Sequence, residues 1–452
     1  MSRLAFVLFT HAVLSQFGDV MMACLNLLNV PIRKIFNESI SSSYNLNHKQ
    51  LELIYSVSAS TMMIGVLVGF LIISRLMEVL GAKDTAITVR CSLGIIGSAS
   101  MVLSFITRRF EFFVLGHFLS GVVSALKVAL FIYVADCSPD KRRGPASMMV
   151  NSGGVLAVLV ATPACMPNLL GSDSSWFILP MFCAVMAAAH LLIAGRFPKS
   201  PKDLYIKERN EKEARAALDF FYEDHHDIDG AIAKMGEEKS HENCQSMSLR
   251  DIMADKTSRN SLIIVLLCAL VPAFSALNVK LQYLMSLLIT FGLSQGEATM
   301  ALTFISAIAA PICFIAPWLI ERFGIRKMFV MITMLCSLEW IGLGVAQVFV
   351  DCNTQHVISS VSAIAGATLG QCAFNLGLLV MSPVMISEVC HYSNRPAITQ
   401  FTQILPLAFA VVEVAAFPTL KSYLGGILYI FFSSCCAMLA VLMFKKLPHK
   451  SH

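Results

Sequence analysis

The sequence predicts an all-α membrane protein in which twelve transmembrane helices form two six-helix bundles. Of its 452 residues, 56% are hydrophobic and 14% are charged, which gives more apolar surface than a soluble core can bury. Twelve apolar segments are long enough to cross a bilayer, because a spanning helix needs about 20 mostly apolar residues. One long polar interval, from Arg196 to Arg259, divides these segments into two groups of six.

Apart from the polar interval between the two groups, the predicted spans are joined by short loops. The spans cover residues 5–31, 51–74, 84–107, 111–135, 146–170, 175–196, 260–291, 298–320, 327–350, 357–386, 397–420 and 423–444. The expected domains are an N-terminal bundle (1–196), a cytoplasmic central loop (197–259), a C-terminal bundle (260–445) and a short cytoplasmic tail (446–452). Arg3 and the apolar residues after it could form a secretory signal, but the apolar run continues to Val30 without a cleavage site, which favours a first span.

Positive charges predict the orientation. The short loops assigned to the inside contain nine Lys or Arg residues and those assigned to the outside contain six, so both termini and the central loop are expected in the cytoplasm. Asn37 begins an N-glycosylation sequon, Asn37-Glu38-Ser39, in the predicted first outer loop. A chance match and a used site both stay open. The expected location is the plasma membrane, and the expected partners are the lipid bilayer and a small-molecule substrate.

Several other functions are disfavoured. The net charge of +5 is spread over cytoplasmic loops and does not predict a nucleic-acid surface. The fourteen Cys residues lie mostly inside apolar runs without metal-ligand spacing, so they are expected to be small core residues. The sequence has no P-loop and no nucleophile elbow, so no enzymatic activity, catalytic residue, metal or cofactor is expected. A monomer is compatible with this plan.

The central loop is expected to be partly helical. The stretch Lys202–Tyr222 carries an apolar stripe at helical spacing, and a second short helix is expected over Ile228–Met235. Ser248 and Asp251 predict a helix start before the seventh span. The favoured interpretation is a solvated cytoplasmic segment without chemistry of its own.

Four cytoplasmic stretches carry motifs of a known family. Between the fourth and fifth spans, Asp136, Pro139, Arg143 and Gly144 form a stretch that resembles the E-x-x-P-x-x-x-R-G turn of sugar porters in the major facilitator superfamily. Similar family motifs are the P-E-S-P-R-x-L sequence at Pro198–Leu204, the E-R-x-G-R-R loop at Glu321–Lys327 and the R-P-A turn at Arg395–Ala397 after Glu388. The resemblance covers essentially the whole chain. It implies alternating access of two bundles, with a cytoplasmic gate formed by Asp136/Arg143, Glu321/Arg322 and Glu388/Arg395.

The hexose-binding positions of that family are largely changed. The seventh-span pattern Q-Q-L-S-G-x-N-A retains only Ser275 and Asn278, the tenth-span Glu is Asn375, and the fifth-span Gln is Asn151. Losing several amide groups weakens the expectation of a plain hexose, since each net hydrogen bond contributes about 1 kcal/mol. The polar residues predicted to line a substrate cavity, with helix-to-helix hydrogen bonds as the alternative, are Asn151, Asn278, Gln282, Gln371 and Asn375.

Two lysines lie deep inside predicted spans, Lys127 in the fourth and Lys280 in the seventh. A charge at the bilayer centre costs at least a few kcal/mol, so each lysine is expected to face a partner or a cavity. Two interpretations stay open. Each lysine pairs with a buried acid, for which Asp19, Glu339 and Glu413 are available, or the lysines line a cavity that attracts an anionic substrate.

Asp19 and His117 form a candidate proton site. In the family, proton-coupled members carry an Asp close to the position of Asp19, and His117 replaces the Arg that pairs with it. Asp19 is one position early, however, which turns it by about 100° on a helix. A purely structural Asp/His or Asp/Lys contact is the alternative.

These observations predict a facilitative carrier of a small polar organic solute, with a sugar acid or urate-like anion slightly ahead of a plain hexose. A proton-coupled symporter that uses Asp19 and His117 is the second mechanism. A non-transporting nutrient sensor with the same fold is the alternative class, and the short C-terminal tail favours the carrier.

Overall fold

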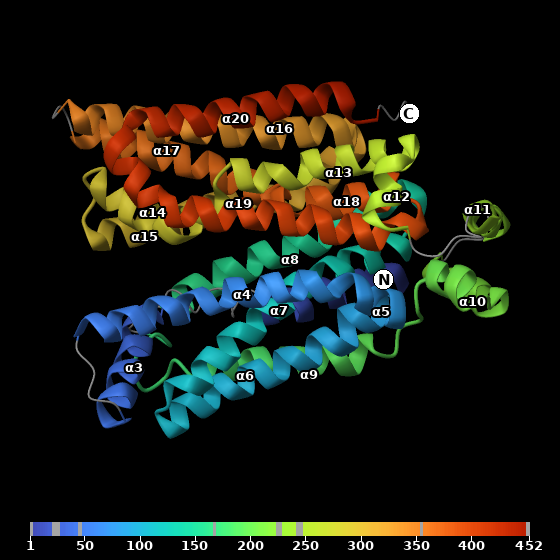
Figure 1. Ribbon diagram of the computed structural model, residues 1–452, viewed down its shortest axis with the longest axis horizontal. Coiled ribbons are helices and arrows are strands. Elements are labelled where there is room, and N and C mark those ends of the chain that lie inside the picture. Colours follow the sequence, from blue (N-terminus) through green and yellow to red (C-terminus); the bar gives the residue numbers. More distant parts are fainter. Residues whose placement is uncertain are drawn as a thin grey trace. The chain divides into compact units, whose positions relative to one another are not determined.

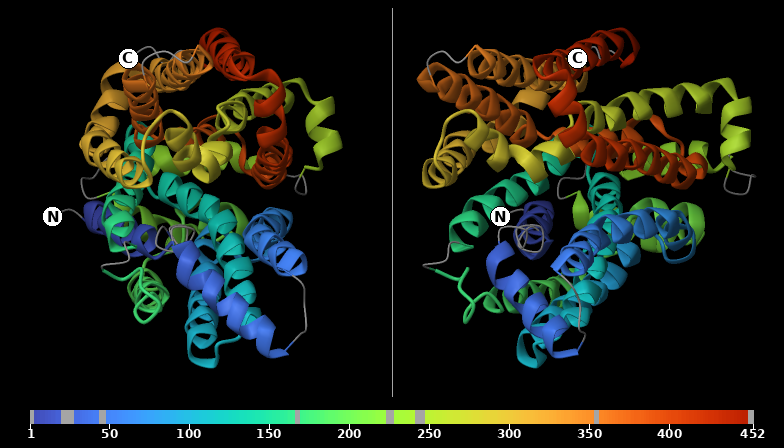
Figure 2. Two further views of the ribbon diagram at one scale, coloured as in Figure 1. Left: turned by 90° about the vertical axis from the view of Figure 1, so that its left-hand side faces the viewer. Right: turned by 60° about the vertical axis from the view of Figure 1, so that its left-hand side comes forward.

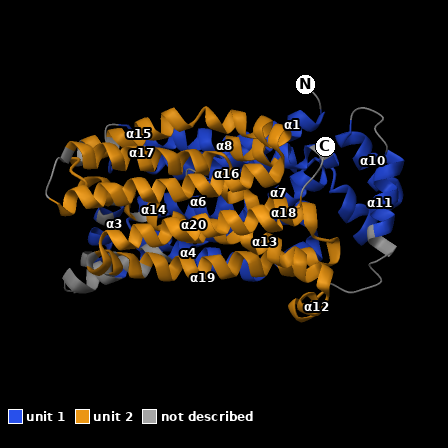
Figure 3. Cartoon of the chain, turned by 90° about the horizontal axis from the view of Figure 1, so that it is seen from above, with its two compact units in different colours: residues 1–146, 153–245 blue, residues 147–152, 246–452 orange. Residues whose placement is uncertain are grey.

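The computed structural model describes residues 3–19, 28–43, 48–165, 169–222, 228–240, 247–352 and 356–448. All regular secondary structure in these ranges is helical (Figure 1). The chain divides into two compact units, which Figure 3 shows in blue and orange. Unit 1 comprises residues 1–146 and 153–245, and unit 2 comprises residues 147–152 and 246–452. Most of the predicted central loop therefore belongs to unit 1.

Unit 1 contains the helices of the predicted N-terminal bundle and two helices of the central segment. The α-helices are α1 (Arg3–Thr10), α3 (Asn29–Ser43), α4 (His48–Leu80), α5 (Ala82–Asp84), α6 (Arg90–Thr107), α7 (Phe110–Asp136), α8 (Arg143–Ala164), α9 (Ile178–Ala194), α10 (Glu211–Phe221) and α11 (Ile228–Ser240). Residues 147–152 of α8 are assigned to unit 2. Three π-helical turns lie at His11–Ser15, Thr85–Val89 and Asp203–Lys207.

Unit 2 contains the remaining helices. They are α12 (Leu249–Ala254), α13 (Lys256–Phe274), α14 (Leu277–Thr290), α15 (Gln295–Ala309), α16 (Ile312–Asp351), α17 (His356–Asn375), α18 (Met381–Val389), α19 (Arg395–Leu424) and α20 (Gly426–Lys446). Helix α16 joins the predicted eighth and ninth spans across a kink at Gly324, which has φ 80° and ψ 158°. Helices α17 and α20 both pack against α16, and Figure 2 shows this part of the chain in orange and red.

Nine helical runs in the described part of the chain are long and apolar enough to cross a membrane. One of them, Met300–Asp351, contains two predicted spans, and Ile178–Ala194 is a shorter apolar helix at the sixth span. The first predicted span lies partly outside the described residues. Every described part of the twelve predicted spans is predominantly helical.

Small residues bring helices of unit 1 together. A Cβ on Gly65 of α4 would collide with the backbone carbonyl of Phe118 on α7, and a Cβ on Gly121 of α7 would collide with that of Met62 on α4. Close approach at glycine is a common basis of helix association in membranes, where the hydrophobic effect does not drive helices together.

Glycine has the same role in unit 2. The backbones of Gly342 on α16 and Gly366 on α17 are so close that a Cβ on Gly342 would lie 2.9 Å from the Cα of Gly366. Gly366 therefore allows close packing of the tenth span against α16.

The region predicted as the first outer loop is a helix. Helix α3 places Ile32, Ile35, Phe36 and Ile40 on one face, and these side chains are buried against a cluster that includes Trp176. Their spacing of three to four residues is the helical period, which explains the helix. Asn37, the predicted glycosylation site, lies on the exposed side of α3.

The central segment forms the expected helices. In α10 the predicted apolar residues Ala214, Leu218 and Phe221 are buried, and Arg215 pairs with Glu211 at 2.9 Å. Ser248 and Asp251 form a capping box at the start of α12, as predicted. Figure 1 shows α10 and α11 beside one end of the helices of unit 1.

Specific contacts attach this segment to unit 1. The Asp203 carboxylate accepts a hydrogen bond of 3.1 Å from the backbone N–H of Ala82, at the turn between α4 and α5. Lys207 donates to the Val79 carbonyl at 2.9 Å, and Lys234 of α11 pairs with Asp140 at 2.7 Å. The segment is therefore a docked part of the bundle rather than a free loop.

Candidate functional site

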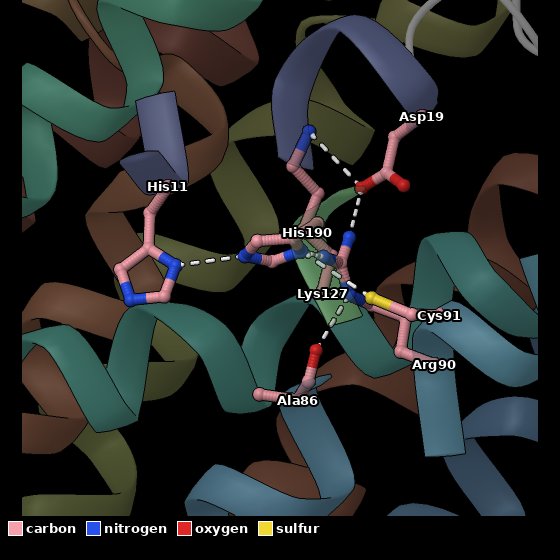
Figure 4. Close-up of polar contacts among 7 residues, drawn as sticks. All are labelled: His11, Asp19, Ala86, Arg90, Cys91, Lys127 and His190. Carbon is pink, nitrogen blue, oxygen red and sulfur yellow. Dashed lines mark hydrogen bonds and ion pairs between the residues drawn. The ribbon is translucent and has the colours of Figure 1, made fainter. Parts of the chain in front are cut away.

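A buried cluster of charged and polar side chains lies inside unit 1 (Figure 4). Its centre is Arg90, the first residue of α6, which follows directly after a π-helical turn. The Arg90 guanidinium pairs with the Asp19 carboxylate and donates a hydrogen bond of 2.8 Å to the Ala86 carbonyl. The Lys127 ammonium of α7 lies 4.0 Å from the same Asp19 oxygen. The acid thus has two cations beside it.

Two histidines continue this cluster. The Arg90 Nη2 atom lies 3.1 Å from Nδ1 of His190, and Nε2 of His190 lies 2.9 Å from Nδ1 of His11. A guanidinium can only donate, so Nδ1 of His190 accepts and its proton is on Nε2. That proton is donated to Nδ1 of His11. Both imidazoles are therefore neutral in this arrangement.

The elements that carry the cluster are unusual. His11 begins a π-helical turn, His11–Ser15, and the turn before Arg90 is also π-helical. Single π-helical turns are rare and occur frequently at functional sites. Together with buried ionisable groups inside membrane helices, they mark this cluster as a candidate site.

A small cavity adjoins the cluster. Asp19, Arg90, Cys91, Ser120 and His190 are among its lining residues, and its volume is about 20 Å³. A polar cavity of that size holds a water molecule but has no room for a sugar. The Arg90 side chain is 2% exposed, whereas those of Asp19 and Lys127 are 13% and 22% exposed.

The predicted proton pair has a different environment. Asp19 contacts Arg90 and Lys127, and the latter contact was one of the structural alternatives. The buried His117 ring stacks on Phe113 with 5.5 Å between ring centroids. Arg90 and His190 are absent from the predicted site residues, although each is an ionisable group within a predicted span. The rule that singled out Lys127 identifies Arg90 equally well.

The lysine of unit 2 has a dedicated partner. Lys280 on α14 lies 2.5 Å from the Glu339 carboxylate on α16, and the two side chains are 7% and 2% exposed. The Lys280 ammonium also lies over the Trp340 ring, 5.9 Å from the ring centroid. On α17, Gly370 leaves room for Glu339, since a Cβ there would collide with the carboxylate. Of the two interpretations for Lys280, the geometry matches the paired one, and an anion-attracting cavity at Lys280 has no support.

The seventh span is interrupted beside this pair. Helix α13 ends at Phe274, Ala276 adopts a left-handed conformation with φ 48°, and α14 begins at Leu277. The Trp340 indole donates a hydrogen bond of 2.8 Å to the Ser275 carbonyl, which the interruption exposes. Asn278 is half-buried in the first turn of α14, while the side chain of Gln282 lies outside the described residues.

The tenth span is interrupted too. Helix α17 ends at Asn375, and Gly377 has φ 107°. Gln371 donates a hydrogen bond of 3.0 Å to the Asn375 side-chain oxygen, which is a bond within one helix. Asn375 is 1% exposed, and its amide nitrogen has no hydrogen-bond partner in the ranges given above. A buried donor of this kind needs a water or a ligand group. Asn151 on α8 is half-buried.

The predicted gate residues are placed as follows. Asp136 is buried at the end of α7, and Arg143 pairs with Asp140 at 2.8 Å. Arg395 is buried and donates to the carbonyls of Ser387 and Cys390, so it caps the end of α18, where Glu388 also lies. The Arg322 guanidinium lies 5.0 Å from the centre of the Trp318 ring, next to the exposed Glu321. Their role as a gate stays a prediction.

No group of three or more His, Cys, Asp or Glu side chains in the described residues has the arrangement of a metal site. Both units instead present polar side chains at interrupted or π-helical segments within apolar helices. Discontinuous helices of this kind form substrate sites in secondary transporters.

Comparisons with known proteins agree with this architecture. The family model described as "Sugar (and other) transporter" matches residues 20–452. The facilitated glucose transporter member 7 of solute carrier family 2 from Mus musculus is 21% identical, over 99% of this chain and 88% of that protein. Member 4 from Homo sapiens is 27% identical, over 62% of this chain and 54% of that protein.

A solved structure has the same fold. The proton:xylose symporter XylE, bound to 6-bromo-6-deoxy-D-glucose, superposes with a TM-score of 0.80 at 15% identity, over 98% of this chain and 96% of that chain. XylE is a member of the major facilitator superfamily, whose fold has twelve transmembrane helices. The fold of this chain is therefore that of the major facilitator superfamily, and since the family model covers nearly the whole sequence, the chain belongs to the sugar transporter family.

Proposed function

We propose that the protein is a facilitative carrier of a hydroxyl-rich organic solute of about hexose size. The observation that carries this proposal is the pair of interrupted spans in unit 2, each with an amide side chain beside the interruption, in a chain of the sugar transporter family. Family membership makes the protein a membrane transporter that works by alternating access and not an enzyme. The names of the relatives and the sugar bound to XylE support a sugar-like substrate.

The proposed substrate contacts in unit 2 are Asn278 and Asn375. Asn278 lies in the first turn after the break at Ala276. Beside the break at Gly377, the Asn375 amide has a donor that no described residue accepts. Gln371 orients Asn375 through its hydrogen bond. Asn151 and Gln282 are further proposed contacts on the sequence pattern alone. Amide groups bind sugar hydroxyls because they both donate and accept hydrogen bonds.

We further propose that the protein lies in the plasma membrane with both termini in the cytoplasm. The distribution of Lys and Arg over the short loops supports this orientation. The exposed position of Asn37 on α3 is compatible with glycosylation on the outer side.

Uptake into proteoliposomes tests the proposal. Purified protein is reconstituted and offered labelled glucose, fructose, xylose and glucuronate, with protein-free liposomes as the reference. Uptake of at least one member is expected, and Asn375→Ala is expected to reduce it about tenfold, because a buried amide is lost from the site. Gln347→Ala is the matched control, since this amide is bonded to Asp351 near the end of α16. Equal loss in both variants, or no uptake of any member, contradicts the proposal.

Proton coupling is the second candidate mechanism. The Asp19 carboxylate lines a water-sized cavity and is partly exposed, so it is a possible proton acceptor, with Arg90 rather than His117 as its observed partner. In that case uptake rises as the outside pH falls, and Asp19→Asn abolishes the dependence. Uptake that is independent of pH, with wild-type rates in Asp19→Asn, excludes this mechanism.

A further inference from the structure

We infer that the substrate carries a negative charge, and that Lys127 of unit 1 binds it as the cation left over from the Asp19–Arg90 pair. This inference rests on the proposed transport function and names the substrate class: a sugar acid of hexose size. Its basis is the balance of charges around Asp19, the hydrogen bonding of Lys127 and the contrast with Lys280.

The charges around Asp19 do not balance. Arg90 and Lys127 each carry a positive charge, and Asp19 supplies the single negative charge. His190 and His11 are neutral, because the guanidinium fixes their tautomers. Cys91, whose thiol lies 3.3 Å from His190, adds no negative charge as a thiol, and the cavity-lining serines, such as Ser120, are neutral. The cluster therefore has one positive charge in excess.

The excess charge belongs to Lys127. Arg90 is tied to Asp19, Ala86 and His190, which uses all three nitrogens of its guanidinium. The Lys127 ammonium lies 4.0 Å from Asp19, which is beyond hydrogen-bonding distance, and no described residue accepts a hydrogen bond from it. The undescribed stretch 20–27 of the first span contains no Asp or Glu. With respect to the described residues, the three ammonium donors of Lys127 are thus available for a ligand.

Lys127 is also more exposed than Asp19 and Arg90, the other charged members of the cluster. Its side chain is 22% exposed on unit 1, compared with 13% for Asp19 and 2% for Arg90. An uncompensated charge inside a membrane helix is costly and marks function by default. A ligand carboxylate that binds Lys127 makes the charge-assisted hydrogen bonds that the protein leaves unmade and restores neutrality.

Unit 2 shows what a structural lysine looks like in the same protein. Lys280 has a carboxylate at 2.5 Å, and both members of that pair are buried. Its charge is cancelled, so it offers nothing to an anion. The two intramembrane lysines, which the sequence does not distinguish, therefore have different chemistry.

The test compares glucuronate with glucose, which differ in the carboxylate while the ring size is the same. Each is measured as a labelled substrate in proteoliposomes and as a ligand that raises the melting temperature of the full-length protein in detergent. Wild type is expected to bind glucuronate at least about tenfold more tightly than glucose. Lys127→Met is expected to remove this preference and Lys127→Arg to keep most of it. Lys421→Met, a lysine that lies 5.8 Å from the Phe291 ring in unit 2, is the matched control.

The outcomes separate this inference from the proposed function. Glucose uptake that exceeds glucuronate uptake and is unchanged in Lys127→Met overturns the inference and leaves the carrier function in place. Chloride that stabilises the protein as strongly as glucuronate, without glucuronate uptake, also overturns it, because the site then binds inorganic anions. If glucuronate neither stabilises the protein nor is taken up, the inference falls, and uptake of neutral sugars alone decides the proposed function.

Discussion

Lys280 and Glu339 form a buried ion pair inside unit 2, with 2.5 Å between the ammonium and the carboxylate oxygen. The pair joins α14, the helix after the break in the seventh span, to α16. Gly370 on α17 leaves room for the carboxylate because it has no Cβ. A pair at such a position stabilises the helix arrangement only as long as both members are charged and present.

Removing one member of this pair is expected to be far more harmful than replacing both. Glu339→Gln leaves the Lys280 charge buried without a counter-ion, which costs about 3–5 kcal/mol, whereas Lys280→Met combined with Glu339→Leu exchanges the pair for apolar groups of similar size. The melting temperature of the purified protein in detergent is the measurement. It should fall strongly in Glu339→Gln and recover most of that loss in the double variant. Equal melting temperatures for wild type and Glu339→Gln contradict a stabilising pair.

Trp340 is expected to hold the interruption of the seventh span in place. Trp340→Phe removes the indole that donates to the Ser275 carbonyl, a loss of about 1 kcal/mol from the hydrogen bond beyond the effect of the smaller ring. Hydrogen exchange of the amides at 275–280 should become faster. Trp176→Phe is the control, because Trp176 is fully buried and its indole nitrogen has no hydrogen-bond partner in the described residues. Similar exchange at 275–280 in the two variants refutes this role.

The sequence predicts the helices of this fold well, because length and period carry the signal. Long apolar runs give the spans, and residues such as Leu218 and Phe221, spaced three apart, give the buried face of α10. The capping box at Ser248 is a local pattern and needs no tertiary information. Helix α3 is predicted as part of the first outer loop, because polar residues lie between its buried isoleucines.

Pairing between helices is harder to predict. The partners Asp19 and Arg90 are 71 residues apart, and only the rotation of each helix brings them together. Both follow π-helical turns, which hold one residue more than an α-helical turn. Counting at 100° per residue from the start of either helix therefore misplaces every later side chain by about one position. His117 is predicted as the partner of Asp19 from the family pattern, which does not contain the contact with Arg90.

The turn between α4 and α5 is expected to tolerate no side chain at Gly81. Its φ of 90° is strained for other residues, and a Cβ there would lie 2.9 Å from the Asp203 carboxylate, which caps the Ala82 N–H. Gly81→Ala therefore combines backbone strain, about 1–3 kcal/mol, with displacement of Asp203. The melting temperature of the purified protein reports the loss of stability. The protease sensitivity of the segment 203–222 reports the displacement of Asp203.

Gly324 provides the matched control for this prediction. It has nearly the same conformation, with φ 80°, but nothing lies within 4 Å of a Cβ built there. Gly324→Ala should show the backbone strain alone, and the segment 203–222 should keep its resistance to protease. If Gly324→Ala and Gly81→Ala release this segment equally, the contact with Asp203 is not what attaches it.

Docking of α11 is expected to depend on the charge of Asp140. Burial alone would raise the pKa of this carboxyl, but the charges of Arg143 and Lys234 and the hydrogen bond from Lys234 outweigh it and hold the pKa below the ordinary value of 3.8. A carboxyl whose pKa is lowered by folding stabilises the folded state at pH values above 3.8 and loses that contribution as the pH falls through its lower, folded-state value. Because Lys234 is 71% exposed, the contribution is below about 1 kcal/mol.

Hydrogen exchange of residues 228–240 is the measurement for this effect. At pH 7, Asp140→Asn should exchange faster than wild type in this segment, and the stability difference between the two proteins should shrink as the pH is lowered below 3.8. Asp229→Asn is the control, since Asp229 pairs with Arg215 inside the central segment and not with the bundle. A difference between wild type and Asp140→Asn that stays constant from neutral to acid pH shows that the lost charge is not the cause. Faster exchange in Asp229→Asn alone places the attachment within the central segment, and α11 then depends on α10 rather than on Asp140.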